Sequence, residues 1–146
     1  MEKHSDKKKL LVVGNGSTAN KKNKEFLIPS QTGYFLKNLS KDFNLLFTQN
    51  ESLYDSNNNL LDFDLNKNKL NFFSYSKDNK YYQIFKILIN IKKNELIHIF
   101  FPGNMGRVYA IFSILFRIPF SLYVRGQFYH TSPIDSLILK KSKFIL

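Results

Sequence analysis

The 146-residue chain contains no cysteine, only three arginines and half as many acidic as basic residues. Without cysteine the protein forms no disulfide and has no thiolate nucleophile or metal ligand, which fits a cytosolic setting. The histidines, His4, His98 and His130, are too scattered for metal-ligand spacing. No serine-nucleophile motif, paired-carboxylate signature or P-loop is present. The sequence therefore predicts no metal centre and no bound cofactor.

Long hydrophobic runs and targeting signals are also missing. The longest apolar stretch, Val108–Val124, carries Arg117 and Pro119, whereas a membrane-spanning helix needs about 20 predominantly apolar residues. At the start of the chain, only Leu10–Val13 follow the charged segment MEKHSDKKK before Gly14, too few for the core of a signal peptide. We therefore expect a cytoplasmic protein that associates with the membrane only at its cytoplasmic face.

What the chain has in excess is positive charge, a net +11 at pH 7. Such a surface attracts anionic partners, including acidic membranes, phosphorylated substrates and nucleic acids. Most of the charge comes from lysine clusters, whereas proteins that read bases and phosphates usually recruit arginine. Solvated lysine faces explain the pattern more simply. We expect no specific nucleic-acid partner, and a basic nucleic-acid-binding module stays as an alternative.

Hydrophobic residues follow the periodicities of strands and helices in alternation. Short apolar runs bounded by glycine or polar residues predict buried strands, and stripes with helical spacing predict amphipathic helices. The strands are expected at Lys9–Val13, Asn44–Thr48, Leu70–Tyr75, Glu95–Phe101 and Phe120–Val124, and the helices at Ser30–Phe43, Tyr81–Ile91, Met105–Phe116 and Ser132–Lys141. This order predicts an α/β fold with a Rossmann-like parallel sheet and helices on both faces, in a single domain of residues 1–146.

The polar connections are expected to carry little regular structure. Residues Gly14–Pro29 are predicted to be a loop or only partly ordered, and Glu51–Asn68 a surface connection with a small hairpin at most. Ser30 is expected to cap the first helix. The apolar stripes are predicted to be Phe35, Leu39 and Phe43 in the first helix, and Tyr81, Ile84, Phe85, Leu88 and Ile91 in the second.

The last residues, Phe144–Leu146, form the start of an apolar strand with no turn or cap after it. A terminal buried strand usually has polar residues beyond it. We therefore expect the chain to be the first part of something longer, either a truncated reading frame or one half of a split enzyme.

Gly14–Ala19 has the spacing G-x-G-x-x-A directly after a predicted strand. In dinucleotide-binding proteins this spacing brings the backbone close to a pyrophosphate at a helix N-terminus. Here Asn20–Lys24 and Pro29 follow, which do not favour a helix, and no acidic residue stands where a ribose is usually held. The pattern favours a flexible glycine loop at the carboxyl edge of the sheet, where Gly14 and Gly16 line a ligand crevice.

A second glycine turn, Pro102–Arg107, joins the fourth predicted strand to its helix. Its two glycines, Gly103 and Gly106, allow close approach of a ligand. The free N–H groups of the helix start favour an anion, so Gly103 and Asn104 are candidate binding residues. Alternatively, the glycines of this turn serve only a tight turn and close helix packing. Both interpretations stay open at this point.

The fifth predicted strand ends in Arg125, Gly126 and Gln127. The forked donors of Arg125 suit phosphate or sugar hydroxyls, although a structural salt bridge is the alternative. His130 follows in the same loop and is the one candidate for a catalytic group. His98, between two isoleucines in an apolar strand, is predicted to be a hydrogen-bonded core histidine.

Four blocks together resemble the N-terminal half of GT-B glycosyltransferases of the family 4-like group: KLLVVG, TGYFLKNLSKDF, ELIHIFFPGNMGRVYAIFSILFRIPFSLYVRGQ and KKSKFIL. In that family a strand of the D-I-I-H type is followed by a glycine loop and then by an I-P-hydrophobic strand that leads to the acceptor loop. Here Glu95–His98 stands in the first of these positions, with Glu for the usual Asp, and Ile118–Phe120 stands in the last.

The resemblance implies an enzyme of polysaccharide biosynthesis that moves a sugar from a nucleotide sugar to a surface polysaccharide or a lipid-linked acceptor. In the family, the N-terminal domain shapes the acceptor site, and a C-terminal domain, which this sequence lacks, binds the donor. The resemblance implies acceptor-crevice roles for Gly14, Gly16, Gly103, Arg125 and the loop Gln127–His130. It also implies docking on anionic membranes and inactivity of this chain alone. A non-catalytic partner subunit of a split transferase is the second interpretation.

Overall fold

The computed structural model describes residues 7–21, 25–55, 60–75, 80–124 and 132–145, which form eight strands and four helices. The strands are β1 Lys9–Lys21, β2 Glu25–Pro29, β3 Asn44–Leu53, β4 Leu61–Asp64, β5 Phe72–Tyr75, β6 Leu96–Phe101, β7 Phe120–Val124 and β8 Phe144–Ile145. The helices are α1 Ser30–Asp42, α2 Lys80–Lys93, α3 Asn104–Leu115 and α4 Pro133–Lys141. Each of the four predicted helices is therefore present, within a few residues of its expected bounds.

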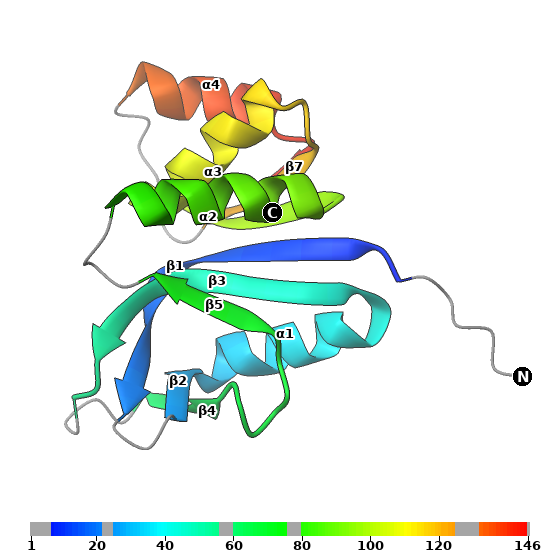
Figure 1. Ribbon diagram of the computed structural model, residues 1–146. Coiled ribbons are helices and arrows are strands. Elements are labelled where there is room, and N and C mark those ends of the chain that lie inside the picture. Colours follow the sequence, from blue (N-terminus) through cyan, green and yellow to red (C-terminus); the bar gives the residue numbers. More distant parts are fainter. Residues whose placement is uncertain (1–6, 22–24, 56–59, 76–79, 125–131, 146) are drawn as a thin grey trace, which may run out of the picture.

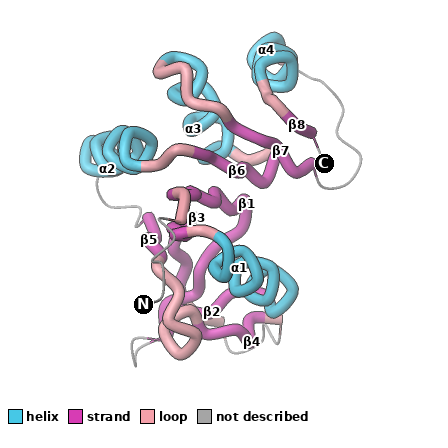
Figure 2. Tube along the Cα trace, turned by 90° about the vertical axis from the view of Figure 1, so that its right-hand side faces the viewer, coloured by secondary structure: helices cyan, strands magenta, loops and turns pink. Residues whose placement is uncertain are grey.

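The elements form three layers with the sheet in the middle (Figure 1). Helices α2, α3 and α4 cover one face, and α1 lies on the other face together with β2 and β4 (Figure 2). Neighbouring residues of β1 serve opposite layers, because Leu11 belongs to the core under α2–α4 whereas Val12 belongs to the core under α1. The predicted α/β fold with helices on both faces is confirmed.

Six strands are parallel, in the order β5-β3-β1-β6-β7-β8. Numbered among themselves along the chain, these strands have the order 3-2-1-4-5-6, which is that of a Rossmann sheet. The chain first builds outward from β1 on one side and then returns to add β6, β7 and β8 on the other. Folds of this kind bind ligands where the order reverses, outside the carboxyl ends of the strands, here those of β1 and β6.

Strand β1 is much longer than predicted because it changes its partner. Its first part, Leu10–Val13, pairs with parallel β6, and its last part, Ala19–Lys21, pairs with antiparallel β2. The prediction that Gly14–Pro29 is a loop is therefore wrong, since most of this segment belongs to β1 and β2. Lysines and asparagines are compatible with strands here because an antiparallel hairpin needs only one buried face, and Ile28 belongs to the core on that face.

The connection Glu51–Asn68 is also more structured than predicted. Strand β3 continues to Leu53, and β4 pairs antiparallel with β2. The sheet is therefore mixed, and the prediction of a parallel sheet holds only for its six-stranded part. Phe63 and Leu65 fix this segment against the sheet, because both side chains are buried in the core beneath α1.

Helix α1 begins differently from the prediction, in which Ser30 caps it. Pro29 occupies the N-cap position, and the carboxylate of Asp62 in β4 accepts hydrogen bonds from the backbone N of Ser30 at 3.0 Å and from its Oγ at 2.6 Å. The hydrogen bond from the Ser30 hydroxyl is the main cause that lowers the pKa of Asp62. A carboxylate from a neighbouring strand thus neutralises the positive end of the helix dipole.

Helix α2 presents a different face to the sheet than predicted. Ile87 and Ile91 are buried against the sheet, whereas Ile84 and Phe85 are exposed. Of the predicted stripe, Ile91 is correctly placed. Both sets of residues have helical spacing, so an apolar surface wider than one stripe leaves the rotation of the helix to be fixed by packing.

Helices α3 and α4 are joined by one ion pair. Arg107 in the first turn of α3 donates two hydrogen bonds to Asp135 in the first turn of α4, Nε to Oδ1 at 2.7 Å and Nη2 to Oδ2 at 3.1 Å. The carboxylate also stands at the start of its own helix, where Ser132 Oγ accepts a hydrogen bond from the Asp135 backbone N. The pair is bidentate, and Asp135 is fully buried.

A first prediction concerns the packing of α1 on β4. A methyl group added at Gly33 would collide with the ring of Phe63. Replacing a helical glycine by alanine normally stabilises a helix by about 1 kcal/mol. We expect Gly33→Ala instead to lower the free energy of unfolding by about 1–3 kcal/mol in urea titrations, because it overpacks the contact. The double variant Gly33→Ala/Phe63→Leu should recover part of this loss, and a stabilised single variant would contradict the contact.

A second prediction concerns the ion pair between α3 and α4. Arg107→Ala leaves the buried carboxylate of Asp135 without its partner, which should lower the free energy of unfolding by about 3–5 kcal/mol. Asp135→Asn should cost less, because the Arg107 side chain is one-third exposed and its charge reaches water. Denaturant unfolding of both variants measures the difference. Equal losses of unfolding free energy in the two variants would show that burial of the Asp135 carboxylate does not determine the size of the loss.

Candidate functional site

The candidate site lies where β1 leaves β6 and has not yet joined β2. The ladder between β1 and β6 ends at Val13, and the ladder between β1 and β2 begins at Ala19. Between them, the register of β1 against β3 shifts, and the shift contains Gly14, Asn15 and Gly16. The sequence-predicted glycines therefore do stand at the reversal point of the sheet, in an irregular strand rather than in a loop.

A pocket of about 150 Å³ opens at this position, and we name it the switch-point pocket. Its lining residues are Asn15, Gly16, Ser17, Pro29, Thr32, Gln49, Leu61 and Phe100. They come from β1, the end of β2, the start of α1, β3, β4 and β6. None of these side chains is charged, and four of them carry amide or hydroxyl groups that both donate and accept hydrogen bonds.

Position 14 has little room for a side chain because two side chains of β3 fill the space beside it. A Cβ atom on Gly14 would lie 3.1 Å from the ring of Phe47 and closer still to Oε1 of Gln49. At Gly16 the same Gln49 oxygen would be 3.7 Å away, which is an ordinary contact. Gly14 therefore serves the packing of two strands, whereas Gly16 lines the pocket and has room for a side chain.

Gln49 is the most buried polar residue of the pocket, with 4% of its surface exposed. Its Nε2 donates a hydrogen bond to Thr18 Oγ1 at 2.8 Å, so that its Oε1 faces the glycines of β1. This bond holds the amide in one orientation. A ligand hydroxyl in the pocket would therefore meet a fixed acceptor.

The electrostatics of the pocket favour a neutral ligand. Pro29 and Thr32 bring the N-terminus of α1 to the pocket, and a helix N-terminus ordinarily attracts anions. Here the carboxylate of Asp62 already accepts from the first N–H of α1 and from the Ser30 hydroxyl. A second negative charge beside that carboxylate would be repelled.

The dinucleotide interpretation of Gly14–Ala19 finds no support in this geometry. The motif lies in a strand that continues to Lys21, so its glycines do not open a helix. Pyrophosphate binding by this fingerprint requires a turn that opens a helix. The glycine spacing therefore matches that of dinucleotide-binding proteins, but the backbone conformation does not.

Gly103 and Asn104 lie beside the pocket at the start of α3. A Cβ atom on Gly103 would come within 3.2 Å of the Asn15 Cβ, so the turn after β6 packs directly on the irregular part of β1. The Asn104 Oδ1 accepts a hydrogen bond from Arg107 at 3.3 Å. Gly106 in the same turn packs against Ile99. The close-packing interpretation of this turn is therefore supported, and Asn104 acts first on its own helix.

The structure brings Gly14, Gly16 and Gly103 together at the reversal point. Arg125, Gly126, Gln127 and His130 lie outside the described residues. Sequence reasoning missed Asn15, Ser17, Thr32 and Gln49 as pocket residues. No signal in the sequence pointed to them, because Gly14–Lys21 has no alternation of apolar and polar residues that would distinguish a strand from a loop.

His98 is a hydrogen-bonded core histidine, as predicted. It is 9% exposed, its Nδ1 and the Ser121 Oγ lie 2.8 Å apart, and its ring packs against Phe35 and Phe100. Burial lowers the pKa of His98 below its ordinary value, which keeps the ring neutral near pH 7. His98 does not line the switch-point pocket.

Two tyrosines form a separate buried pair in the other core. Tyr75 and Tyr109 are hydrogen-bonded through their hydroxyls, and burial raises the pKa of both. The pair lies beneath α2 and α3, on the face of the sheet opposite α1. These phenols are neutral packing groups that join β5 to α3.

Comparison with known proteins adds no assignment, since no protein-family model matches the chain and no curated protein is significantly similar to its sequence. Within the described ranges, no group of three or more histidines and carboxylates is placed to hold a metal ion. Nor does the described part of the chain contain a helix with the length and hydropathy of a membrane span.

A third prediction concerns the charge state of His98. Because its pKa is lower in the folded protein than the value of about 6.5 in unfolded chains, protonation favours unfolding. Its contribution to stability is complete above about pH 6.5 and is lost as the pH falls below that value. Between pH 7.5 and 5.5, wild type should lose about 1 kcal/mol more unfolding free energy than His98→Asn, measured by urea titration. Equal losses of unfolding free energy in wild type and in His98→Asn would contradict a neutral, buried His98 ring.

Proposed function

We propose that the chain is the acceptor-binding domain of a glycosyltransferase with GT-B architecture. It binds a sugar of a surface polysaccharide or of a lipid-linked acceptor, and a separate donor domain supplies the nucleotide sugar. The observation that carries the proposal is the switch-point pocket, a small uncharged pocket at the reversal point of a Rossmann-type sheet.

The chemistry of the pocket fits a sugar better than a phosphate. A sugar presents neutral hydroxyl groups together with apolar C–H patches. The pocket offers hydroxyl and amide partners beside the apolar side chains of Leu61 and Phe100. The one structural feature that would attract an anion, the start of α1, is already satisfied by Asp62.

The uncharged lining also supports the division of labour in the proposal. The diphosphate of a nucleotide sugar needs cationic or N–H donors, and the described pocket supplies no cation. The chain is therefore an acceptor domain without transferase activity of its own. It works either as one half of a single transferase or as a non-catalytic partner subunit of a split enzyme.

A fourth prediction tests sugar binding at the pocket. Saturation-transfer NMR with methyl glycosides of common hexoses and with short oligosaccharides should show binding of at least one sugar by the wild-type protein. Gly16→Val should abolish the signal, because the new side chain enters the pocket at a position where its Cβ meets only ordinary contacts. Asn50→Val, at an exposed position of β3 outside the pocket, is the matched control and should bind like wild type.

The same samples distinguish the proposal from its rivals. Incubation with nucleotide sugars and acceptors should give no transfer by the chain alone, and transfer once a donor domain is added. Turnover by the chain alone would refute the division of labour. Sugar signals that are absent, or that survive Gly16→Val, would refute the pocket as the acceptor site.

A further inference from the structure

The face of the sheet that carries α1 is only partly covered. Helix α1 packs on β2, β3 and β4, and among the described residues no helix lies on this face over β6 and β7 (Figure 2). Parallel strands are normally buried on both faces. A groove with a volume of about 350 Å³ lies over this uncovered part of the sheet, and we name it the apolar groove. Its lining includes Phe35 and Leu39 from α1, Phe43 directly after α1, and Leu96, His98 and Ser121 from the sheet.

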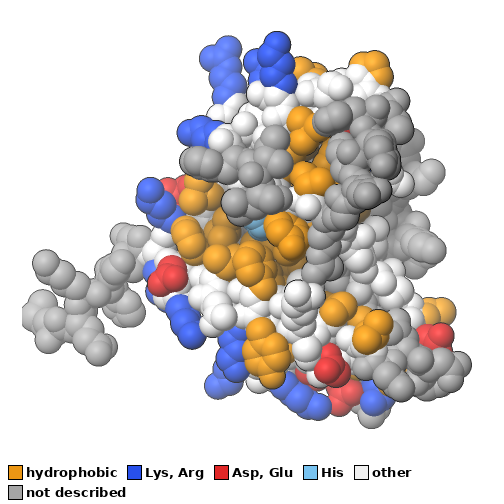
Figure 3. Space-filling view, turned by 180° about the vertical axis from the view of Figure 1, so that it is seen from behind, with side chains coloured by type: hydrophobic (Ala, Val, Ile, Leu, Met, Phe, Trp, Pro, Cys, Tyr) orange, Lys and Arg blue, Asp and Glu red, His pale blue; other side chains and the backbone are white. Residues whose placement is uncertain are grey.

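Figure 3 shows this face, where hydrophobic side chains gather around a histidine. The two polar groups of the groove floor satisfy each other, since His98 and Ser121 are hydrogen-bonded. Burial lowers the pKa of His98, so the floor carries no charge near pH 7. An apolar chain could therefore lie in the groove without stripping water from a charge.

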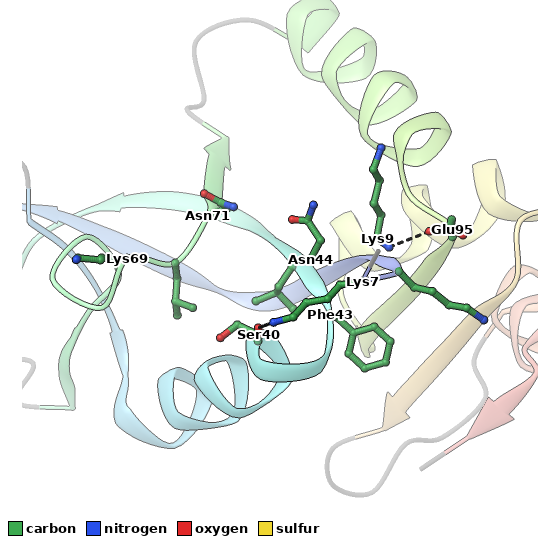
Figure 4. A pocket seen from close by; sticks show the side chains of 11 residues that line it. Lys7, Lys9, Ser40, Phe43, Asn44, Lys69, Asn71 and Glu95 are labelled. Carbon is green, nitrogen blue, oxygen red and sulfur yellow. Dashed lines mark hydrogen bonds between the residues drawn. The ribbon is translucent and has the colours of Figure 1, made fainter. Parts of the chain in front are cut away.

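A basic pocket adjoins the groove at the amino ends of the strands (Figure 4). It has a volume of about 950 Å³ and shares Phe43 with the apolar groove. Four lysines line it, Lys7, Lys8, Lys9 and Lys69. Its one carboxylate, Glu95, accepts a hydrogen bond from the backbone N of Lys9 at 3.0 Å, and Lys7 Nζ donates to the Ser40 carbonyl at 3.2 Å.

Positive charge is therefore concentrated at one end of the groove. Lys143, just before β8, lines the groove itself and lies at the same amino edge. Within the described chain, no carboxylate forms a salt bridge with Lys7, Lys8 or Lys143. At the opposite edge of the sheet, the lining of the switch-point pocket is uncharged.

The position of the lysines at one end of the groove distinguishes between the possible ligands of the groove. A second copy of the chain carries the same net charge of +11 and would be repelled. An amphipathic helix carries its charged residues along both sides of its apolar face, whereas these lysines stand at one end. A bilayer surface cannot enter a concave groove, but a single hydrocarbon chain can. One charged head and one apolar tail match the arrangement.

We propose that the apolar groove binds the hydrocarbon chain of a single-tailed anionic amphiphile, an alkyl or isoprenyl phosphate, whose head group lies at the basic pocket. The head group then sits at the amino edge, and the tail points along β6 toward the carboxyl edge. Any sugar carried on that head group would therefore lie at the amino edge of the sheet, whereas the switch-point pocket lies at the carboxyl edge. The two sites therefore bind different molecules, and the lipid site does not depend on the proposed sugar site.

The test measures binding of dodecyl phosphate below its micelle concentration to the whole chain by isothermal titration calorimetry. Dodecyl phosphate should bind, and inorganic phosphate should bind too weakly to detect. Each methylene in contact with the groove adds about fourfold in affinity, so decyl phosphate should bind about sixteenfold more weakly. An equal response to all three compounds would overturn the proposal.

Groove variants test the tail. Phe35→Ser and Leu39→Ser change partly exposed side chains and should weaken dodecyl phosphate at least about tenfold, with a shallower dependence on chain length. Leu115→Ser, at a position of α3 that is 67% exposed, is the matched control and should bind like wild type. Weakening by the control as strong as that by the groove variants would overturn the location.

Lysine variants test the head group without touching the core. Wild type should prefer dodecyl phosphate to the zwitterionic dodecylphosphocholine by at least about tenfold at low salt. The triple variant Lys7→Gln/Lys8→Gln/Lys143→Gln should lose this preference. The control Lys92→Gln/Lys93→Gln/Lys140→Gln removes the same charge from helices α2 and α4, which lie on the opposite face of the sheet, and should keep it. If both triple variants lost the preference for dodecyl phosphate equally, net charge alone would explain the effect, and the proposed head-group site would be overturned.

Two further ligands separate the alternatives. Vesicles of phosphatidylcholine and phosphatidylglycerol, and an acidic amphipathic peptide, are titrated against the same variants. Binding of either one, sensitive to Phe35→Ser and without any binding of dodecyl phosphate, would overturn the proposal in favour of a membrane or a protein partner. If dodecyl phosphate does not bind but the sugar signals are present, the lipid proposal fails and the acceptor proposal is unaffected. If dodecyl phosphate binds but no sugar does, the acceptor proposal fails and the lipid proposal is unaffected.

Discussion

The structure depends on one constraint, the change of partner along β1. A strand has two edges, and β3 occupies one of them for almost the full length of β1. The other edge is shared by β6 and, beyond the register shift, by β2. Because β6 and β2 cannot occupy the same positions, the sheet divides there. The irregular segment between the two ladders, Gly14–Gly16, is consequently the place where backbone and side chains line a pocket rather than a ladder.

The two edges of the sheet have opposite electrostatic character, and the helices explain part of this. Each helix runs antiparallel to its strands, so helix C-termini, with their partial negative charge, gather at the amino edge. Basic residues in the last turns of α1, α2 and α4 complement those ends. Lys7 and Lys8, which precede β1, exceed that need, since they follow no described helix. At the carboxyl edge, Asp62 neutralises the start of α1.

The sequence sufficed for the helices and for the strands of the parallel part, because these carry strong apolar periodicity. It failed for Gly14–Pro29 and Glu51–Asn68, where one buried face per strand leaves a polar composition that resembles a loop. It also misplaced the start of α1, because Asp62 caps that helix from a strand 32 residues later. Of the candidate site, only the glycines could be found, since Gln49 becomes a pocket residue through the pairing of β1 with β3.

Helix α1 connects the two proposed sites mechanically. Its first turn contributes Thr32 to the switch-point pocket, and its later turns contribute Phe35 and Leu39 to the apolar groove. The first turn is fixed, because Asp62 holds Ser30 and the ring of Phe63 packs on Gly33. The later turns pack on β6, since the ring of Phe35 lies against His98 and Phe100, and Phe100 also lines the switch-point pocket. The same helix thus contributes to both sites, and the contact between Phe35 and Phe100 joins the wall of the apolar groove to the wall of the switch-point pocket.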